Sequence, residues 1–171
     1  MKKLAIITAL VASNALFATS AFAESFAVSV DGTVTDTTCA ASVDKTSVAM
    51  PSVNKNAFAT VGKEVIGDDF TVSISACPAG TTKAVIAIKG TPDSDNTALF
   101  TTRHNAGDAD GFGIKVKAGN NVVSPNGTTE YTLANGAVTA PYYVDYVSTK
   151  ALGNLKSGVI KSTLNVDVSY Q

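Results

Sequence analysis

The chain has 171 residues, with 13 Lys and Arg, 14 Asp and Glu and one His, so its formal net charge is −1. It carries no basic run of the kind that binds a nucleic-acid backbone, so we expect no nucleic-acid partner. A single histidine excludes the copper–zinc sites of enzymes built on β-sandwiches, which need several, and we expect no cofactor.

The first 23 residues have the layout of a secretory signal peptide. A basic start, Met1-Lys2-Lys3, precedes an apolar run at 4–12, and Ser20-Ala21-Phe22-Ala23 is a small-x-small cleavage pattern. The apolar stretch is too short, and too interrupted by polar residues, to suit a membrane anchor. We therefore predict a signal peptide at 1–23 and an exported domain that begins at Glu24.

Cys39 and Cys77 are the two cysteines of the chain. An even pair in an exported protein predicts a disulfide. The loop that it closes would stabilise the fold by roughly 4 kcal/mol in the chain-entropy description. A metal site is the alternative, which the single histidine and the lack of a CxxC motif disfavour.

Beyond the signal peptide the dominant pattern is short alternating apolar runs separated by turn residues, which predicts an all-β sandwich or barrel. The continuous apolar run at 84–88 suggests a strand buried on both faces or one crossing the core. Asn126-Gly127 suggests a hairpin turn between 122–123 and 131–133. The expected strands, in chain order, are 26–34, 47–50, 70–76, 84–88, 99–100, 112–116, 122–123, 131–133, 142–146 and 158–171.

The last run, 158–171, alternates strictly and stops at the final residue of the sequence. One parity is apolar and the other is polar, as in a strand with one face in a core. Asp167 is the one acidic residue from Ser162 onward and no proline follows it, so this edge lacks the usual protection against pairing. The apolar parity comprises Ile160, Leu164, Val166, Val168 and Tyr170.

The segment at 26–34 is complementary to that edge. It presents one apolar face, with a glycine in register, and glycine inside a strand often marks a close backbone approach. The pattern fits either the first strand of the domain's own sheet or an extension that pairs elsewhere. The residues of this face are Phe26, Val28, Val30, Gly32 and Val34.

Residues with catalytic potential are few. His104 lies in a polar loop and is expected to be a surface residue, since no nucleophile-elbow motif accompanies it. Asp108-Ala109-Asp110-Gly111 resembles half of a calcium loop but lacks the distant Glu, so a solvated turn is expected. Asn126-Gly127-Thr128 fits a glycosylation triplet, a short pattern that is frequent by chance.

Four motifs in this order, together with the signal peptide and the cysteine pair, resemble the chaperone–usher pilins, in particular fimbrial subunits of the type 1-like class. They are Gly32-Thr33-Val34-x-x-x-x-Cys39, Phe70-x-Val72-x-Ile74-x-x-Cys77, Ala140-Pro141-Tyr142-x-x-x-Tyr146 and Val166-x-Val168-x-Tyr170-Gln171.

The resemblance implies an incomplete immunoglobulin-like β-sandwich at 35–171 that lacks its seventh strand, preceded by a donor-strand extension at 24–34. A periplasmic chaperone would first fill the gap along Leu164, Val166, Val168 and Tyr170. At an outer-membrane usher, the extension of a neighbouring pilin subunit would then replace the chaperone strand, a known mode of strand addition. The resemblance further implies a non-enzymatic subunit of a cell-surface fimbria that supports adhesion, with any host receptor engaged through the fibre.

A secreted β-sandwich that binds carbohydrate as a monomer is the alternative function. It predicts exposed aromatic side chains on one face, for which Tyr142, Tyr143 and Tyr146 are the candidates. Their alternation instead suggests that Tyr142 and Tyr146 belong to the core. A small exported enzyme is a third class, which the single histidine disfavours.

Overall fold

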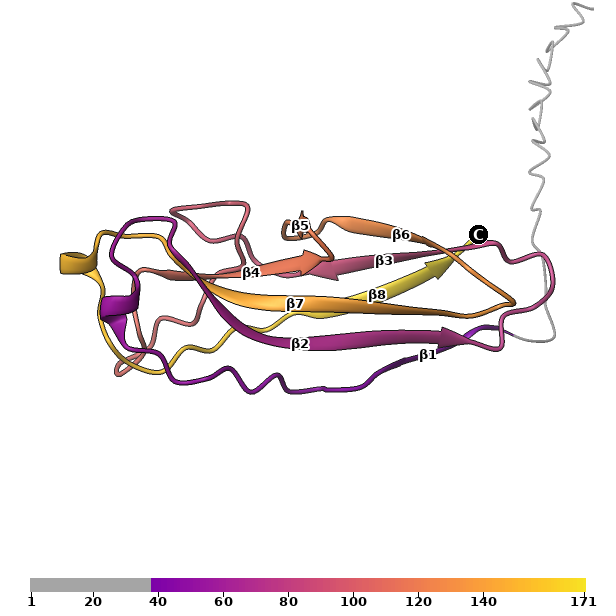
Figure 1. Ribbon diagram of the computed structural model, residues 1–171, viewed down its shortest axis with the longest axis horizontal. Helices are drawn as coiled ribbons and strands as arrows, with labels where there is room; N and C mark the ends of the chain where they lie inside the picture. Colours follow the sequence, from indigo (N-terminus) through magenta and orange to yellow (C-terminus); the bar gives the residue numbers. More distant parts are fainter. Residues whose placement is uncertain (1–37) are drawn as a thin grey trace, which may run out of the picture. The chain divides into compact units, whose positions relative to one another are not determined.

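The computed structural model describes residues 38–171, and these form two antiparallel β-sheets with two short 3-10 turns (Figure 1). The five-stranded sheet has the order β1-β2-β7-β4-β5, and the three-stranded sheet has the order β6-β3-β8. The elements are β1 (Ala40–Val43), η1 (Lys55–Ala57), β2 (Glu64–Ser75), β3 (Lys83–Lys89), β4 (Phe112–Ala118), β5 (Asn121–Val123), β6 (Thr128–Thr132), β7 (Val138–Ser148), η2 (Leu152–Asn154) and β8 (Asn165–Tyr170).

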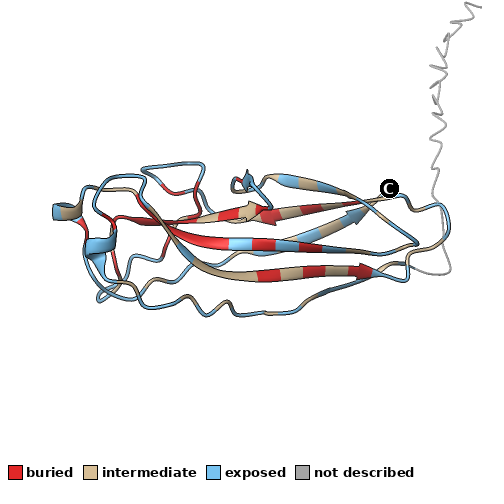
Figure 2. Ribbon diagram, in the orientation of Figure 1, coloured by how far each residue is buried: buried red, intermediate tan, exposed pale blue. Residues whose placement is uncertain are grey.

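Alternating side chains from both sheets form one core, as the bands of buried residues along the strands show (Figure 2). In β2, Phe70, Val72 and Ile74 are buried, and in β7 Tyr142 is fully buried against the ring of Phe70. The all-β sandwich predicted from the alternation is confirmed. Of the three tyrosines at 142–146, Tyr142 and Tyr146 are core residues as predicted.

β3 is the central strand of the smaller sheet, paired with β6 on one edge and β8 on the other. Ala84, Ile86 and Ile88 are fully buried, whereas Val85 and Ala87 are half-buried. The continuous apolar run at 84–88 therefore has one core face and one partly covered face, so it is not buried on both faces.

The turn at Asn126-Gly127 does not close a hairpin, and that prediction was wrong. β5 pairs with β4 in the larger sheet, while β6 pairs with β3 in the smaller one, so this turn carries the chain from one sheet to the other. The backbone N–H of Asn126 donates to Ile88, and the N–H of Ile88 donates to Gly127. The turn thus pairs with the end of β3, and Asn126 adopts the left-handed φ of 66° that asparagine tolerates.

The final strand is shorter than the alternation suggested. β8 begins at Asn165, opposite Lys89, where its partner β3 ends. Gly90 follows, and the ring of Phe100 packs where a Cβ at Gly90 would lie, so no paired strand continues there. Residues 158–164 bond instead to the loop at 101–111, through Arg103 N–H to Lys161 and Ala109 N–H to Val159.

The segment at 47–50 is also not a strand, contrary to the sequence prediction. It belongs to a stretch at 44–54 that follows β1 without regular pairing. Beyond β1, which pairs with β2 over only four residues, the chain leaves the sheet edge and forms one wall of the groove described below.

Candidate strand-binding groove

β1 is one edge strand of the larger sheet, and β8 is one edge strand of the smaller sheet. In residues 38–171, β8 pairs with β3 alone and β1 pairs with β2 alone, so one edge of each strand has no strand partner. An unpaired edge exposes a row of backbone N–H and C=O groups that can bind another strand. The structure therefore has the open edge that the final alternating run predicted.

A cavity of about 780 Å³ lies along these edges. One wall is residues 43–50 and the other is residues 160–166. The floor consists of Phe70, Ile114 and Val144, one buried apolar side chain from each of β2, β4 and β7. An apolar floor between two walls suits a segment that offers apolar side chains along one face.

A second cavity of about 430 Å³ continues the first. Its lining includes the aromatic side chains of Phe58, Phe112 and Tyr146 and the backbone segment 157–160. Met50 and Ile160 line both cavities, so they form the boundary between the two.

The wall opposite β8 is held by contacts from the sheet. Tyr146 of β7 donates its hydroxyl to the carbonyl of Pro51 at 3.2 Å. Lys45 donates to the carboxylate of Asp68 at 3.0 Å and to the carbonyl of Asp69 at 2.8 Å. The hydrogen bond to Asp68 raises the pKa of Lys45, so the groove rim keeps a cation at neutral pH.

The predicted residues in and next to β8 alternate between half-buried and exposed, as expected. Leu164 and Val166 line the larger cavity, while Val168 and Tyr170 are half-buried further along β8 and pack on the core. Asn165, Asp167 and Ser169 are exposed. At the chain's last residue, the carbonyl of Gln171 accepts from the N–H groups of Thr82 and Lys83, which extends the pairing to the end of the sequence.

Cys39 and Cys77 form the predicted disulfide, with their Cα atoms 4.1 Å apart. The bond joins the start of β1 to the segment after β2, next to the Asn135-Gly136 turn, where the backbone N–H of Cys77 donates to Gly136. The predicted donor-strand residues Phe26, Val28, Val30, Gly32 and Val34 lie outside the described residues, and their role stays a prediction.

The opposite wall of the groove was missed from the sequence. Val43, Val48 and Met50 are half-buried against the core without belonging to a paired strand beyond Val43. Val48 and Met50 do show a two-residue spacing, which led to the prediction of a strand. That spacing indicated which side chains face inward but not whether the backbone is paired.

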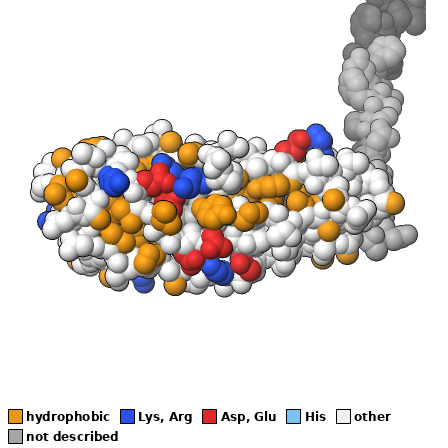
Figure 3. All heavy atoms as spheres, in the orientation of Figure 1, with side chains coloured by type: hydrophobic (Ala, Val, Ile, Leu, Met, Phe, Trp, Pro, Cys, Tyr) orange, Lys and Arg blue, Asp and Glu red, His pale blue; other side chains and the backbone are white. Residues whose placement is uncertain are grey.

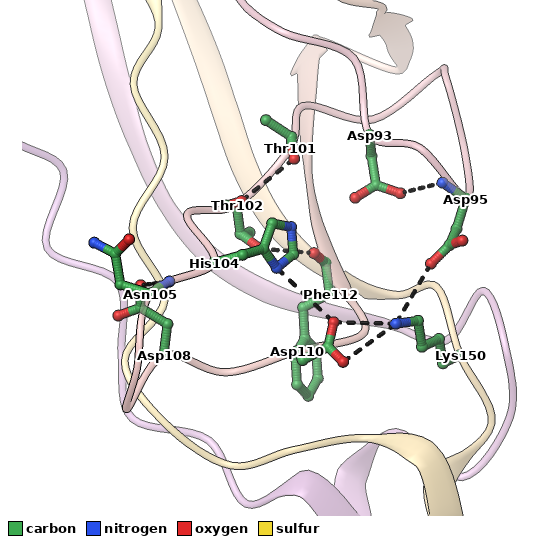
Figure 4. A network of polar contacts seen from close by, with 10 residues as sticks. All are labelled: Asp93, Asp95, Thr101, Thr102, His104, Asn105, Asp108, Asp110, Phe112 and Lys150. Carbon is green, nitrogen blue, oxygen red and sulfur yellow. Dashed lines mark hydrogen bonds and ion pairs between the residues drawn. The ribbon is translucent and has the colours of Figure 1, made fainter.

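The polar loop at 101–111 carries ion pairs (Figure 4). Arg103 donates twice to the carboxylate of Asp108, each time at 2.8 Å, and Asn105 N–H donates to it too. These contacts lower the pKa of Asp108 to about 2. Lys150 lies 3.1 Å from Asp110, and His104, whose side chain is 52% exposed, lies 3.8 Å from the same carboxylate.

The two carboxylates of the calcium-like turn are thus paired with Arg103 and Lys150. They do not converge on one point. Within the described residues, no group of three His, Cys, Asp or Glu side chains is placed to hold a metal ion. On the face of the molecule drawn in Figure 3, basic and acidic side chains lie close together. In one such ion pair of the structure, the ammonium of Lys117 is 2.6 Å from the buried carboxylate of Asp145. In the part of the chain that is described, no helix is long and apolar enough to cross a membrane.

The class of protein follows from the fold and its open edge. The structure is similar to that of a chaperone–usher pilus subunit, with a TM-score of 0.64 at 20% identity over 86% of this chain and 96% of that one. It is also similar to the P pilus rod subunit PapA, with a TM-score of 0.63 at 19% identity over 79% of this chain and all of that one. The fold is thus the immunoglobulin-like β-sandwich of the pilins.

Sequence relatives are consistent with that class. The chain is 31% identical to the long polar fimbria protein A of Salmonella typhimurium over 168 residues, 92% of each chain. The model of the fimbrial protein family matches residues 28–171. The chain therefore belongs to the fimbrial protein family, and it is a structural subunit of a fimbria.

Proposed function

We propose that this subunit polymerises by donor-strand exchange, with residues 24–34 of one copy binding in the groove of another subunit. The single observation that carries the proposal is the groove with an apolar floor that leads to the start of β8, whose outer edge has no strand partner among residues 38–171. An added strand would pair its backbone with that edge and direct alternate side chains onto Phe70, Ile114 and Val144.

The proposed donor segment is short enough to lie along the segment that it would pair with. A strand rises about 3.3 Å per residue, so Phe26 to Val34 spans roughly 26 Å. The stretch from Ile160 to Tyr170, which comprises the groove wall at 160–166 and the rest of β8, spans roughly 33 Å if it is fully extended. Burying Phe26, Val28, Val30 and Val34 would contribute about 1.5–3 kcal/mol each before the entropy of ordering the segment is subtracted. Contacts that join one subunit to the next without closing produce an open filament.

We further propose that a periplasmic chaperone occupies the groove before assembly, and that an outer-membrane usher exchanges the chaperone strand for the extension. The N-terminal 23 residues would direct the chain into the periplasm as a cleaved signal peptide. The fibre would then be displayed at the cell surface, where adhesion is a property of the polymer. Strand exchange needs no catalytic side chain.

The test is a binding measurement with a synthetic 24–34 peptide and a chain from which Glu24 to Asp31 have been deleted. The proposal predicts a one-to-one complex, measured by calorimetry. In the peptide, Val30→Asp should abolish binding because that parity faces the groove, whereas the neighbouring Ser29→Asp should bind. A truncated chain that ignores the peptide, or equal loss in both variant peptides, would rule out the proposal.

The full-length chain provides the second arm of this test. By light scattering it should form concentration-dependent oligomers that the deletion removes. A stable full-length monomer that also ignores the peptide would favour the carbohydrate-binding alternative. That alternative has little structural support, because Tyr142 and Tyr146 are buried and Tyr143, 46% exposed, is alone among these three in facing solvent.

A further inference from the structure

Met50 lies where the two cavities of the groove meet. It and Ile160 are the two residues that line both the 780 Å³ and the 430 Å³ cavity. A strand that runs from one cavity into the other would therefore contact both side chains. Met50 is half-buried and packs on the core.

The surroundings of Met50 fix its side chain at that point. β2 is irregular between Ile66 and Asp68, and a Cβ at Gly67 would overlap the Sδ and Cε atoms of Met50, so the glycine leaves room for the thioether. The next residue, Pro51, is held through its carbonyl by the hydroxyl of Tyr146. The thioether thus packs against Gly67, and the Met50 side chain lines both cavities.

We propose that Met50 is an oxidation site that controls whether the groove accepts an apolar strand, an inference that rests on the strand-binding function proposed above. A peroxide transfers one oxygen atom to Sδ: a sulfur–oxygen bond forms, the oxygen–oxygen bond breaks, and hydrogen peroxide leaves as water. Sulfur loses two electrons and the peroxide gains them. The sulfoxide is polar, so it places an acceptor where a bound strand would need apolar contact.

The composition of the chain makes the modification simple to follow. Apart from Met1, which lies in the predicted signal peptide, Met50 is the sole methionine. The two cysteines are joined in a disulfide and hold no free thiol. Addition of one oxygen atom, measured by mass spectrometry, therefore reports on this side chain.

The experiment uses the chain of the peptide-binding test above, lacking Glu24 to Asp31 and freed of the signal peptide with Met1. It is treated with hydrogen peroxide, and its affinity for the 24–34 peptide is measured before and after. We expect the oxidised protein to bind about tenfold more weakly, since a buried unpaired sulfoxide oxygen is costly. Met50→Leu should bind the peptide and be indifferent to peroxide, and Met50→Gln should bind as weakly as the oxidised protein. Bound peptide should also slow oxidation about tenfold by covering the thioether.

The outcomes separate the two proposals. If the untreated chain and Met50→Leu both ignore the peptide, the strand-binding function fails. If both bind it and oxidation leaves the affinity unchanged, the oxidation proposal alone is overturned. Equal oxidation rates with and without bound peptide would also overturn it, because Met50 would then lie outside the covered groove.

Discussion

The hydroxyl of Tyr146 donates a hydrogen bond to the backbone carbonyl of Pro51, and this bond ties the central strand β7 to the wall of the groove. The two residues are 95 positions apart in the chain. Burial raises the pKa of Tyr146, so its hydroxyl remains a donor at neutral pH. The stretch at 44–54, which contains most of this wall, belongs to no strand. The hydrogen bond from Tyr146 is therefore one of the contacts that hold it in place.

Removing that hydroxyl should loosen the wall. Tyr146→Phe is expected to lower the free energy of unfolding by about 1 kcal/mol, because the part-buried hydrogen bond to the carbonyl of Pro51 is lost. It should also weaken binding of the 24–34 peptide. The matched control is Tyr143→Phe, on the exposed face of the same strand, which should leave both values unchanged in urea unfolding and calorimetry. Equal effects from the two variants would contradict the role of Tyr146.

The disulfide should contribute strongly to stability. Replacing Cys39 and Cys77 by serine is expected to cost about 2–5 kcal/mol, the usual range for a native bond in a small exported domain. Urea unfolding of the variant against the oxidised parent measures the difference. A loss below about 1 kcal/mol would indicate that the pairing of β1 with β2 holds this end without the covalent bond.

Two glycines in the last third of the chain make a matched pair. A Cβ at Gly158 would overlap the backbone of Gly107 and Asp108, whereas a Cβ at Gly153 would meet nothing within 4 Å. Gly158→Ala should therefore destabilise the fold by about 1–3 kcal/mol and separate the loop at 101–111 from the groove wall. Gly153→Ala should stay within about 0.5 kcal/mol, and a similar loss in both variants would contradict the close approach.

Acid should weaken the fold through Glu64. Hydrogen bonds from Lys115 and Lys117 lower the pKa of Glu64 to about 2, below its ordinary value of 4.5. A carboxyl with a depressed folded-state pKa stabilises the fold above its unfolded pKa, and that stabilisation is lost as the pH falls from about 4.5 to 2. The pKa of Asp108 is lowered in the same direction, by Arg103.

Thermal unfolding between pH 6 and pH 2 tests this effect. The parent should lose stability through that acid window, and Glu64→Gln should lose less. Lys115→Met removes one cause of the depressed pKa, so its loss should begin at the same pH, which the unfolded chain sets, but should be smaller and end at a higher pH than in the parent. Identical acid profiles for all three proteins would show that Glu64 does not carry the effect.

The sequence predicted those features of the fold that follow from alternation and composition. The core faces of β2, β4, β7 and β8 could be read from two-residue spacing, and the disulfide from an even cysteine pair. The prediction of a hairpin at Asn126-Gly127 was wrong because turn residues specify a local backbone shape. They do not specify which strands the flanking segments pair with. The prediction of where β8 starts was wrong, because the length of this strand is set by its partner, β3.

The groove could be predicted only in part, because a local pattern does not state which distant segments come together. The apolar parity of β8 identified one wall, since an uncovered alternating strand implies a missing neighbour. The facing wall around Met50 depends on where the chain runs after it leaves β1, which no local pattern states. Its contacts with Gly67 and Tyr146 come from residues distant in the sequence.

The most direct test of strand binding is hydrogen–deuterium exchange on the chain lacking Glu24 to Asp31, with and without the 24–34 peptide. Strand addition predicts that bound peptide slows exchange at 43–50 and 160–166, the two walls of the groove, and along the rest of β8, while β5 and the exposed loop at 104–107 exchange as before. Protection confined to other surfaces, or no change at β8 when the peptide is bound, would contradict the account.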